Sequence, residues 1–150
     1  MKSNLSSLEP DPIVCRIAEL KKLFVKTLLE AVPCCLAIYR FGSWGTDAQR
    51  NDSDIDIAIL PHQALDPVCC WKLAQTLASL AGRDVDLVDL LRAPTVLRMQ
   101  VVAHGELLYS TGSNDVDQFE DTVFSSYARL NEERREILAD VLQRRSIYGK

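Results

Sequence analysis

The sequence predicts an α/β (α+β) protein in which a small mixed sheet is flanked by helices and followed by a long C-terminal helix. Several segments repeat apolar residues at steps of three and four, which is typical of amphipathic helices. Shorter segments are continuously apolar or alternate, as strands do, and proline or glycine separates the two kinds. We expect a single domain over residues 1–150, with a core at about 12–110 and a C-terminal helix at about 115–146.

The first helix is predicted from Pro12 to Ala31. Asp11 precedes it as a capping residue, and a proline at the first helical position favours this start. Pro33 interrupts the helical pattern, and the apolar run from Cys34 to Phe41 then predicts a buried strand. The helix face expected to enter the core consists of Ile13, Ile17, Leu20, Phe24 and Leu28.

A polar stretch from Gly42 to Ser53 predicts a turn and a short helix, and Ile55 to Leu60 predicts the second strand. Side chains two residues apart on a strand share a face. Asp54 and Asp56 therefore project together, while the isoleucines between and after them form the opposite, buried face.

The C-terminal half contains five further elements with the same signals. They are a helix from Pro67 to Gly82, a strand from Val85 to Leu90, a helix from Pro94 to His104, a strand from Leu107 to Tyr109 and a helix from about Asp115 to Arg145. Asp66 is the capping residue before the first of these helices, and Gly105 ends the second. Two roles are open for the last helix. It packs across the domain with a solvated outer face, or its distal half docks a partner or a second copy. Its apolar stripe is Phe119, Val123, Tyr127, Leu130, Ile137 and Val141.

The composition limits the range of partners and compartments. A net charge of −4 and a pI near 5.2 provide no general attraction to nucleic acid, so no direct nucleic-acid binding is expected. The five cysteines have no metal-ligand spacing, and we expect them to act as small core residues. The N-terminus lacks a signal-peptide pattern and no segment is long and apolar enough for a membrane span. We therefore expect no membrane partner and a cytoplasmic protein with reduced thiols.

Asp54 and Asp56 are the strongest candidates for metal binding. Residues i and i+2 of a strand are about 6.6 Å apart along the backbone, and their carboxylates point to the same side. Such oxygen ligands suit Mg²⁺, which commonly completes its coordination with water and substrate phosphate. In phosphoryl or nucleotidyl transfer, two ions about 3.5 to 4 Å apart stabilise the attacking and the leaving oxygen.

Gly42 and Ser43 are candidates for phosphate binding, because they follow directly on a predicted strand. A glycine lets the backbone approach an anion closely, and successive N–H groups can form an anion-binding concavity. The Ser43 hydroxyl adds a further donor.

The segment GSWGTDAQRNDSDIDIAIL, residues 42–60, resembles the GS and DxD signature of the DNA polymerase β-like nucleotidyltransferase superfamily. In the minimal nucleotidyltransferases (MNT) ten residues separate the two motifs, as they do between Ser43 and Asp54. The superfamily also has a third acidic residue on a later strand. By this resemblance Asp86, in the phrase VDLVDL, is the third carboxylate, either as a metal ligand or as the base that deprotonates the incoming hydroxyl.

The resemblance extends from the first helix to about Tyr109, and it implies the polymerase β-like nucleotidyltransferase fold, ATP as substrate and Mg²⁺, with two ions, as cofactor. Chains of this size resemble the antitoxins of HEPN/MNT toxin–antitoxin pairs. This implies a protein adenylyltransferase that moves AMP from ATP to a hydroxyl, expected to be a tyrosine, of a cognate HEPN-domain toxin, with which it can form a hetero-oligomer. The alternatives are an antitoxin that acts by binding alone and a transferase for a small molecule such as an aminoglycoside.

Several neighbouring residues compete for roles in this site. Asp84 shares the strand face of Asp86, and Asp89 lies on the opposite face, where a strand-end or capping role is the alternative. Ser53 either supports the DxD segment by hydrogen bonding or forms a turn. Trp44 either stacks on adenine or, as we prefer, packs against a helix. The arginines that can reach phosphate, or else form ordinary surface ion pairs, are Arg40, Arg50 and Arg83.

Overall fold

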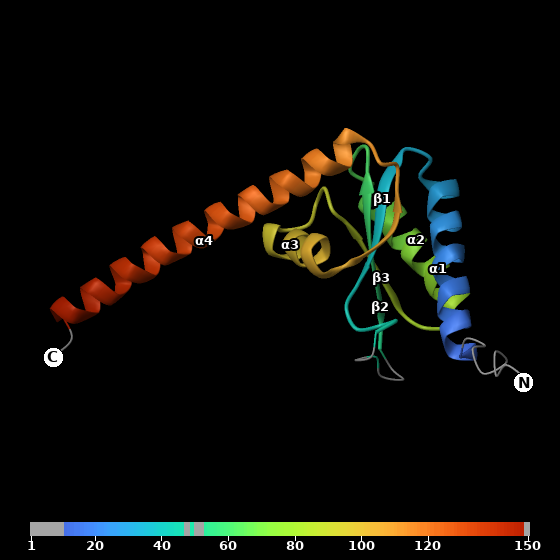
Figure 1. The fold of residues 1–150 in the computed structure, drawn as a ribbon, viewed down its shortest axis with the longest axis horizontal. Helices are drawn as coiled ribbons and strands as arrows, with labels where there is room; N and C mark the ends of the chain where they lie inside the picture. Colours follow the sequence, from blue (N-terminus) through green and yellow to red (C-terminus); the bar gives the residue numbers. More distant parts are fainter. Residues whose placement is uncertain (1–10, 47–48, 50–52, 149–150) are drawn as a thin grey trace, which may run out of the picture.

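The elements follow one another in the predicted order in the computed structural model, which describes residues 11–46, 49 and 53–148 (Figure 1). Their bounds differ from the predicted ones by only a few residues. In chain order they are α1 (Pro12–Ala31), β1 (Cys35–Phe41), β2 (Ile55–Pro61), α2 (Pro67–Ala81), β3 (Val85–Asp89), α3 (Thr95–His104), β4 (Glu106–Ser110) and α4 (Asn114–Tyr148).

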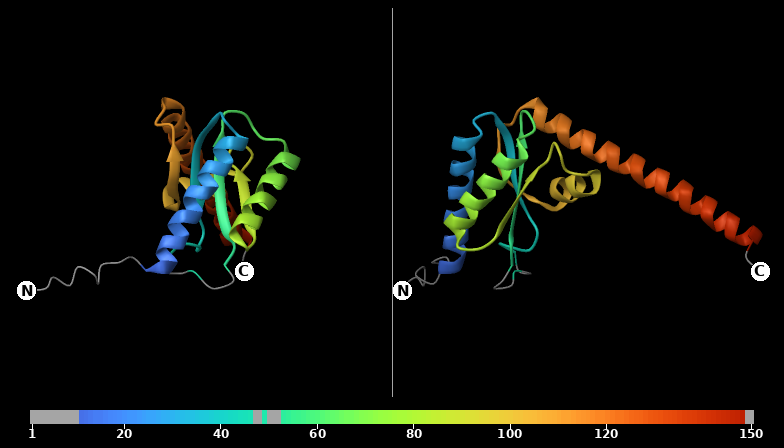
Figure 2. Two further views of the ribbon diagram at one scale, coloured as in Figure 1. Left: turned by 90° about the vertical axis from the view of Figure 1, so that its right-hand side faces the viewer. Right: turned by 180° about the vertical axis from the view of Figure 1, so that it is seen from behind.

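The strands form one mixed sheet in the order β3-β2-β1-β4. Strand β1 pairs antiparallel with β2 and with β4, whereas β2 pairs parallel with β3. Helices α1 and α2 cover one face, and α3 with the first turns of α4 lies on the other (Figures 1 and 2). The predicted α/β class with a mixed sheet and a long C-terminal helix is confirmed.

Each face of the sheet has its own apolar core, because β1 and β2 are buried on both sides. On the α1 and α2 side, Phe24 and Leu28 of α1 meet the alternate isoleucines of β2. On the other side, Val101 of α3 and Val116 of α4 pack on the intervening residues of the strands. Tyr39 also donates a hydrogen bond of 2.7 Å from its hydroxyl to Glu120, which ties the start of α4 to β1.

The helix ends largely follow the predicted signals. The Asp11 side chain accepts a hydrogen bond of 3.0 Å from the backbone N–H of Ile13, and Gly82 ends α2 in the left-handed conformation. Asp66 makes no capping hydrogen bond, so the fixed φ of Pro67 is the local start signal. At Gly105 an added Cβ would lie 2.3 Å from the Val101 carbonyl oxygen, so only glycine fits there.

Some predicted core positions are wrong. Ile13 is 63% exposed, and the buried residues of α1 are Phe24 and Leu28, so the predicted face enters the core only in the later part of the helix. Among the cysteines only Cys35 is buried, and burial raises the pKa of its thiol to about 11; Cys34 and Cys69 are exposed. The turn predicted after Gly42 is present over residues 42–46, and most of the stretch in which the short helix was predicted lies outside the described residues.

Helix α4 combines both predicted behaviours in different parts of its length. Its first turns pack on the sheet through Val116 and Val123. Its distal part extends away from the rest of the chain (Figures 1 and 2). Ile137 and Val141, which belong to the predicted apolar stripe, are 64% and 43% exposed, so packing across the domain does not extend to this part of the helix. Docking of a partner by this distal part stays a prediction.

Among the described residues, no helix has the length and apolar content needed to cross a membrane.

Truncating Phe24 tests the α1 side of the core. Its side chain is fully buried against β2 and Trp44, so Phe24→Ala should lower the free energy of unfolding by about 3–5 kcal/mol. Ile13→Ala, on the same helix, should change it by less than about 0.5 kcal/mol because the side chain is exposed. Urea denaturation of both variants measures the difference, and equal losses would contradict this assignment of the core.

Candidate active site

The chain leaves β1 through Gly42, where only glycine fits. Its φ is +74°, in the left-handed region that L side chains rarely adopt. An added Cβ would also lie 2.1 Å from the Oδ2 atom of Asp56. The backbone after β1 therefore passes directly beside a carboxylate of β2, which brings the two predicted motifs together.

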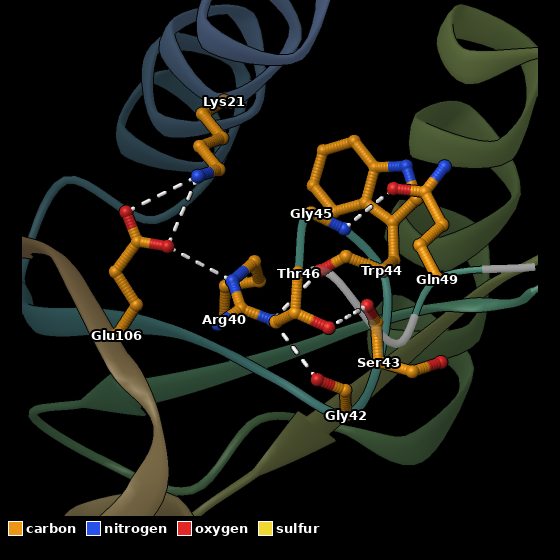
Figure 3. A network of polar contacts seen from close by, with 9 residues as sticks. All are labelled: Lys21, Arg40, Gly42, Ser43, Trp44, Gly45, Thr46, Gln49 and Glu106. Carbon is orange, nitrogen blue, oxygen red and sulfur yellow. Dashed lines mark hydrogen bonds and ion pairs between the residues drawn. The ribbon is translucent and has the colours of Figure 1, made fainter. Parts of the chain in front are cut away.

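A buried arginine holds the turn that starts at Gly42 (Figure 3). Arg40 is only 6% exposed, and its Nη1 donates to the carbonyl oxygens of Gly42 at 3.0 Å and Trp44 at 2.7 Å. Its Nε donates to Oε2 of Glu106 at 2.9 Å, and Lys21 contributes its Nζ at 3.0 Å to the same oxygen. The guanidinium thus links the turn to β4 and, through Glu106, to α1.

Sequence reasoning placed Arg40 among possible phosphate contacts and missed this positioning role. The available signal was a charged residue inside an apolar strand, since a buried arginine needs partners for its charge and its N–H groups. Its partner Glu106 lies 66 residues further along the chain, and no spacing rule connects the two.

The Glu106 carboxylate is stabilised in its charged form. Burial by itself would raise its pKa, but the hydrogen bonds and positive charges of Arg40 and Lys21 outweigh burial and hold the pKa below the ordinary value of glutamate. The ion pair therefore stabilises the turn as long as Glu106 is ionised.

Local hydrogen bonds complete the turn. The Gly45 N–H donates to Oε1 of Gln49 at 2.8 Å (Figure 3). The backbone N–H of Thr46 donates to the Ser43 carbonyl oxygen at 3.1 Å, and the Thr46 hydroxyl donates to the same oxygen. The Ser43 hydroxyl donates to the Ser53 hydroxyl at 3.3 Å, so the turn and the start of the DxD segment are in contact.

Trp44 packs in the core as we preferred. It is 2% exposed, and its ring centroid lies 6.2 Å from that of Phe24 at a tilt of 45°. Stacking on adenine is therefore excluded for the indole in this arrangement, and its contribution is to anchor the turn on α1.

Strand register brings the three predicted carboxylates to one place. Asp56 lies opposite Phe41 of β1 and also opposite Asp86 of β3, and Asp54 immediately precedes β2. Burial raises the pKa of Asp56, and the negative charges of Asp86 and then Asp54 raise it further. The register and the sequence place Asp56 between Asp86 and Asp54, so two like charges lie close to it, while the positive charge of Arg40 acts in the opposite direction.

The competing residues have structural contacts of their own. Asp89 is 7% exposed and accepts hydrogen bonds from the backbone N–H groups of Leu65 at 2.8 Å and Leu91 at 2.9 Å. Its capping role is thereby confirmed. Asp84 is exposed, and its carbonyl oxygen accepts from Ile55 at the start of the parallel pairing.

Two further arginines were considered for phosphate binding. Arg83 donates from Nη1 to the Ser53 carbonyl oxygen at 3.3 Å, which supports the entry to β2. Arg50 lies outside the described residues, so its predicted contact stays a prediction.

The geometry therefore places the Gly42 turn beside a group of carboxylates, and comparison with known proteins gives the family. The model of the family described as polymerase beta, nucleotidyltransferase, matches residues 24–114, a range that includes the turn, all three aspartates and β4. The chain belongs to the polymerase β nucleotidyltransferase family. The family membership expected from the sequence is confirmed.

Relatives within this family are toxin–antitoxin proteins. The protein adenylyltransferase MntA of Shewanella oneidensis is 44% identical over 118 residues, or 79% of this chain and 84% of the relative. A crystal structure of a toxin–antitoxin with AMP-PNP aligns with a TM-score of 0.73 and 43% identity, covering 81% of this chain and 98% of that chain. A complex of the tri-AMPylated Shewanella oneidensis HEPN toxin with its MNT antitoxin aligns with a TM-score of 0.71 and 41% identity, covering 83% and 98%.

The donor set of this nucleotidyltransferase fits a hard divalent cation. Among the described residues, no group of three or more His, Cys, Asp or Glu side chains is arranged to hold a metal ion by itself. Mg²⁺, however, is commonly held by one or two carboxylates, with water and substrate phosphate as further ligands. The carboxylate oxygens have the right chemistry, and the repulsion that raises the pKa of Asp56 is of the kind that a cation relieves.

Replacing Arg40 tests its role in this nucleotidyltransferase. Arg40→Met should lower the free energy of unfolding by about 1–3 kcal/mol, because charge-assisted hydrogen bonds to the turn and to Glu106 are lost. It should also weaken AMP-PNP binding. Lys22→Met, which removes an exposed charge from α1, is the matched control and should change neither quantity measurably. Denaturation and calorimetric titration of both variants check the result, and unchanged AMP-PNP affinity in Arg40→Met would contradict it.

The Glu106 ion pair also predicts a pH effect. Because the folded-state pKa is lowered, the stabilisation is present above the ordinary glutamate pKa and is lost as the pH falls through the folded pKa. Wild type should therefore lose more stability than Glu106→Gln on acidification below about pH 5. Denaturation curves at a series of pH values give the two slopes, and parallel slopes would count against the ion pair.

Proposed function

We propose that this nucleotidyltransferase is an ATP-dependent protein adenylyltransferase and the antitoxin of a HEPN/MNT pair. In this role it transfers AMP from ATP to a hydroxyl, expected to be a tyrosine, of the cognate HEPN-domain toxin. The observation that carries the proposal is the contact of the Gly42 turn with Asp56, at the centre of three carboxylates. The 44% identity to an adenylyltransferase supports the choice of reaction.

The residue roles form part of the proposal. Gly42 and Ser43 bind the triphosphate through backbone N–H groups and the serine hydroxyl. Asp54 and Asp56 hold Mg²⁺, with two ions expected, and Asp86 either completes the metal site or serves as the base. The bound ions would stabilise negative charge on the phosphate and on the leaving oxygen.

The transfer itself is a substitution at the α-phosphorus of ATP. The acceptor oxygen forms a bond to this phosphorus, and the bond to the β-phosphate bridging oxygen breaks. Pyrophosphate leaves, and the hydroxyl proton passes to a base, for which Asp86 is the candidate because it lies exposed beside Asp56. Arg40 positions the turn and does not contact the reacting atoms in this scheme.

The proposed organisation is one minimal nucleotidyltransferase domain over residues 1–150, acting in the cytoplasm. The relatives solved with a HEPN toxin support a toxin partner and a hetero-oligomer. The exposed apolar residues in the distal part of α4 are compatible with such a contact.

Label transfer is the direct test of the activity. Wild-type protein with purified HEPN toxin, ATP labelled at the α-phosphate and Mg²⁺ should label the toxin. The double variant Asp54→Ala and Asp56→Ala should label it at least about 10³-fold more slowly, because the proposed metal ligands are gone. Complex formation with the toxin, measured by size-exclusion chromatography, should be retained.

The outcome also separates the competing functions. A well-folded wild-type protein that binds the toxin and transfers no label would support neutralisation by binding alone. Labelling of an aminoglycoside in place of the toxin would support the small-molecule alternative. Toxin labelling by wild-type protein that continues unchanged in the presence of EDTA would contradict Mg²⁺ as the cofactor.

Stability measurements test Asp56 without an acceptor. In EDTA at neutral pH, Asp56→Asn should raise the free energy of unfolding, because the neutral amide removes repulsion from Asp86 and Asp54. Mg²⁺ with AMP-PNP should raise the melting temperature of wild type more than that of the variant. Thermal unfolding with both additions checks this, and a variant that gains as much as wild type would argue against metal binding at Asp56.

A further inference from the structure

A groove of about 530 Å³ lies along the outer side of β3, between α2 and the start of α3. Helices α2 and α3 lie on opposite faces of the sheet, and β3 is an edge strand between them (Figure 1). The groove, here called the β3 groove, has a largely apolar lining. Its members used below are Trp71 and Gln75 of α2, Asp86 of β3, and Arg92 and Leu97 on the α3 side.

The β3 groove is continuous with the candidate active site. Asp86 lines the groove and also lies beside Asp56 in strand register. A group bound in the groove at Asp86 is therefore next to the place where the α-phosphate is proposed to lie. None of the residues that hold the turn, such as Arg40, lines this groove.

Trp71 is the conspicuous side chain of the groove. It is 63% exposed, although tryptophan usually buries most of its surface. Exposed tryptophans surrounded by apolar side chains are common centres of binding energy in protein interfaces. Trp71 belongs to neither core cluster, so its exposed ring is not accounted for by packing in the core.

Charged side chains lie at both ends of the β3 groove. Asp86 places a carboxylate at the end next to the candidate site. At the other end the charge of Arg92 is partly balanced, because its Nε lies 4.0 Å from Oδ2 of the buried Asp89 and donates to the Leu65 carbonyl oxygen at 3.1 Å.

We propose that the β3 groove binds the acceptor segment of the protein substrate, in continuity with the candidate site. The inferred segment carries its hydroxyl at the Asp86 end and places an apolar or aromatic side chain against Trp71. This inference rests on the proposed adenylyltransferase function and adds the surface that selects the acceptor. The reaction is unchanged: the acceptor oxygen bonds to the α-phosphorus, pyrophosphate leaves, and the hydroxyl proton goes to the base.

The test separates acceptor binding from nucleotide binding. With purified HEPN toxin as the probe, Trp71→Ala should raise the KM for toxin by about tenfold or more, as expected for a central interface tryptophan. The KM for ATP and the affinity for AMP-PNP should stay within about twofold of wild type, because Trp71 is distant from the turn in the fold. Gln75→Arg, which puts a bulky cation into the groove from an exposed position, should have the same pattern.

Leu107→Ala is the matched control, since it removes an exposed apolar side chain from β4 at the opposite edge of the sheet. It should leave both KM values unchanged. Unaltered toxin KM in both groove variants, or an equal loss in Leu107→Ala, would overturn the groove proposal while wild-type labelling still upheld the adenylyltransferase. Absence of toxin labelling by wild type, despite AMP-PNP binding, would overturn both.

Discussion

The pairing of β2 with both β1 and β3 is the constraint on which the site depends. The pairing with β1 places Phe41, and hence the turn after it, opposite Asp56. The pairing with β3 places Asp86 opposite the same Asp56. A slip of one residue in either pairing would turn the carboxylates to the other face of the sheet. The register is fixed because both faces of β2 are buried, so the apolar core determines the position of the candidate catalytic carboxylates.

The second requirement is the buried positive charge of Arg40, which binds the backbone of the turn. Arg40 occupies an inward position of β1, where an apolar residue would be expected, and its N–H groups bind two carbonyl oxygens of the turn and Glu106. Leaving a buried charge without partners would be costly, so the turn, β4 and α1 are stabilised together. The crowding of three carboxylates around Asp56 has the opposite effect on stability. Such local destabilisation is typical of sites built for function.

Much of this organisation was predictable from the sequence, because each element has its own local signal. Alternation gave the common direction of Asp54 and Asp56, and proline and glycine marked the ends of α1 and α2. The interaction of Arg40 with Glu106 was missed because it joins residues that only strand order brings together. The exposure of Ile13 was also missed, since periodicity identifies an apolar face and does not show how much of that face enters the core.

The central claim is that the turn at Gly42 and the three aspartates form one nucleotide and metal site. A crystal structure of the protein grown with AMP-PNP and Mg²⁺ tests it most directly. We expect phosphate oxygens at the backbone N–H groups of Gly42 and Ser43, and Mg²⁺ at about 2.0–2.1 Å from carboxylate oxygens of Asp54 and Asp56. Nucleotide bound elsewhere, for example between α1 and α2, with no metal at these aspartates, would contradict the account.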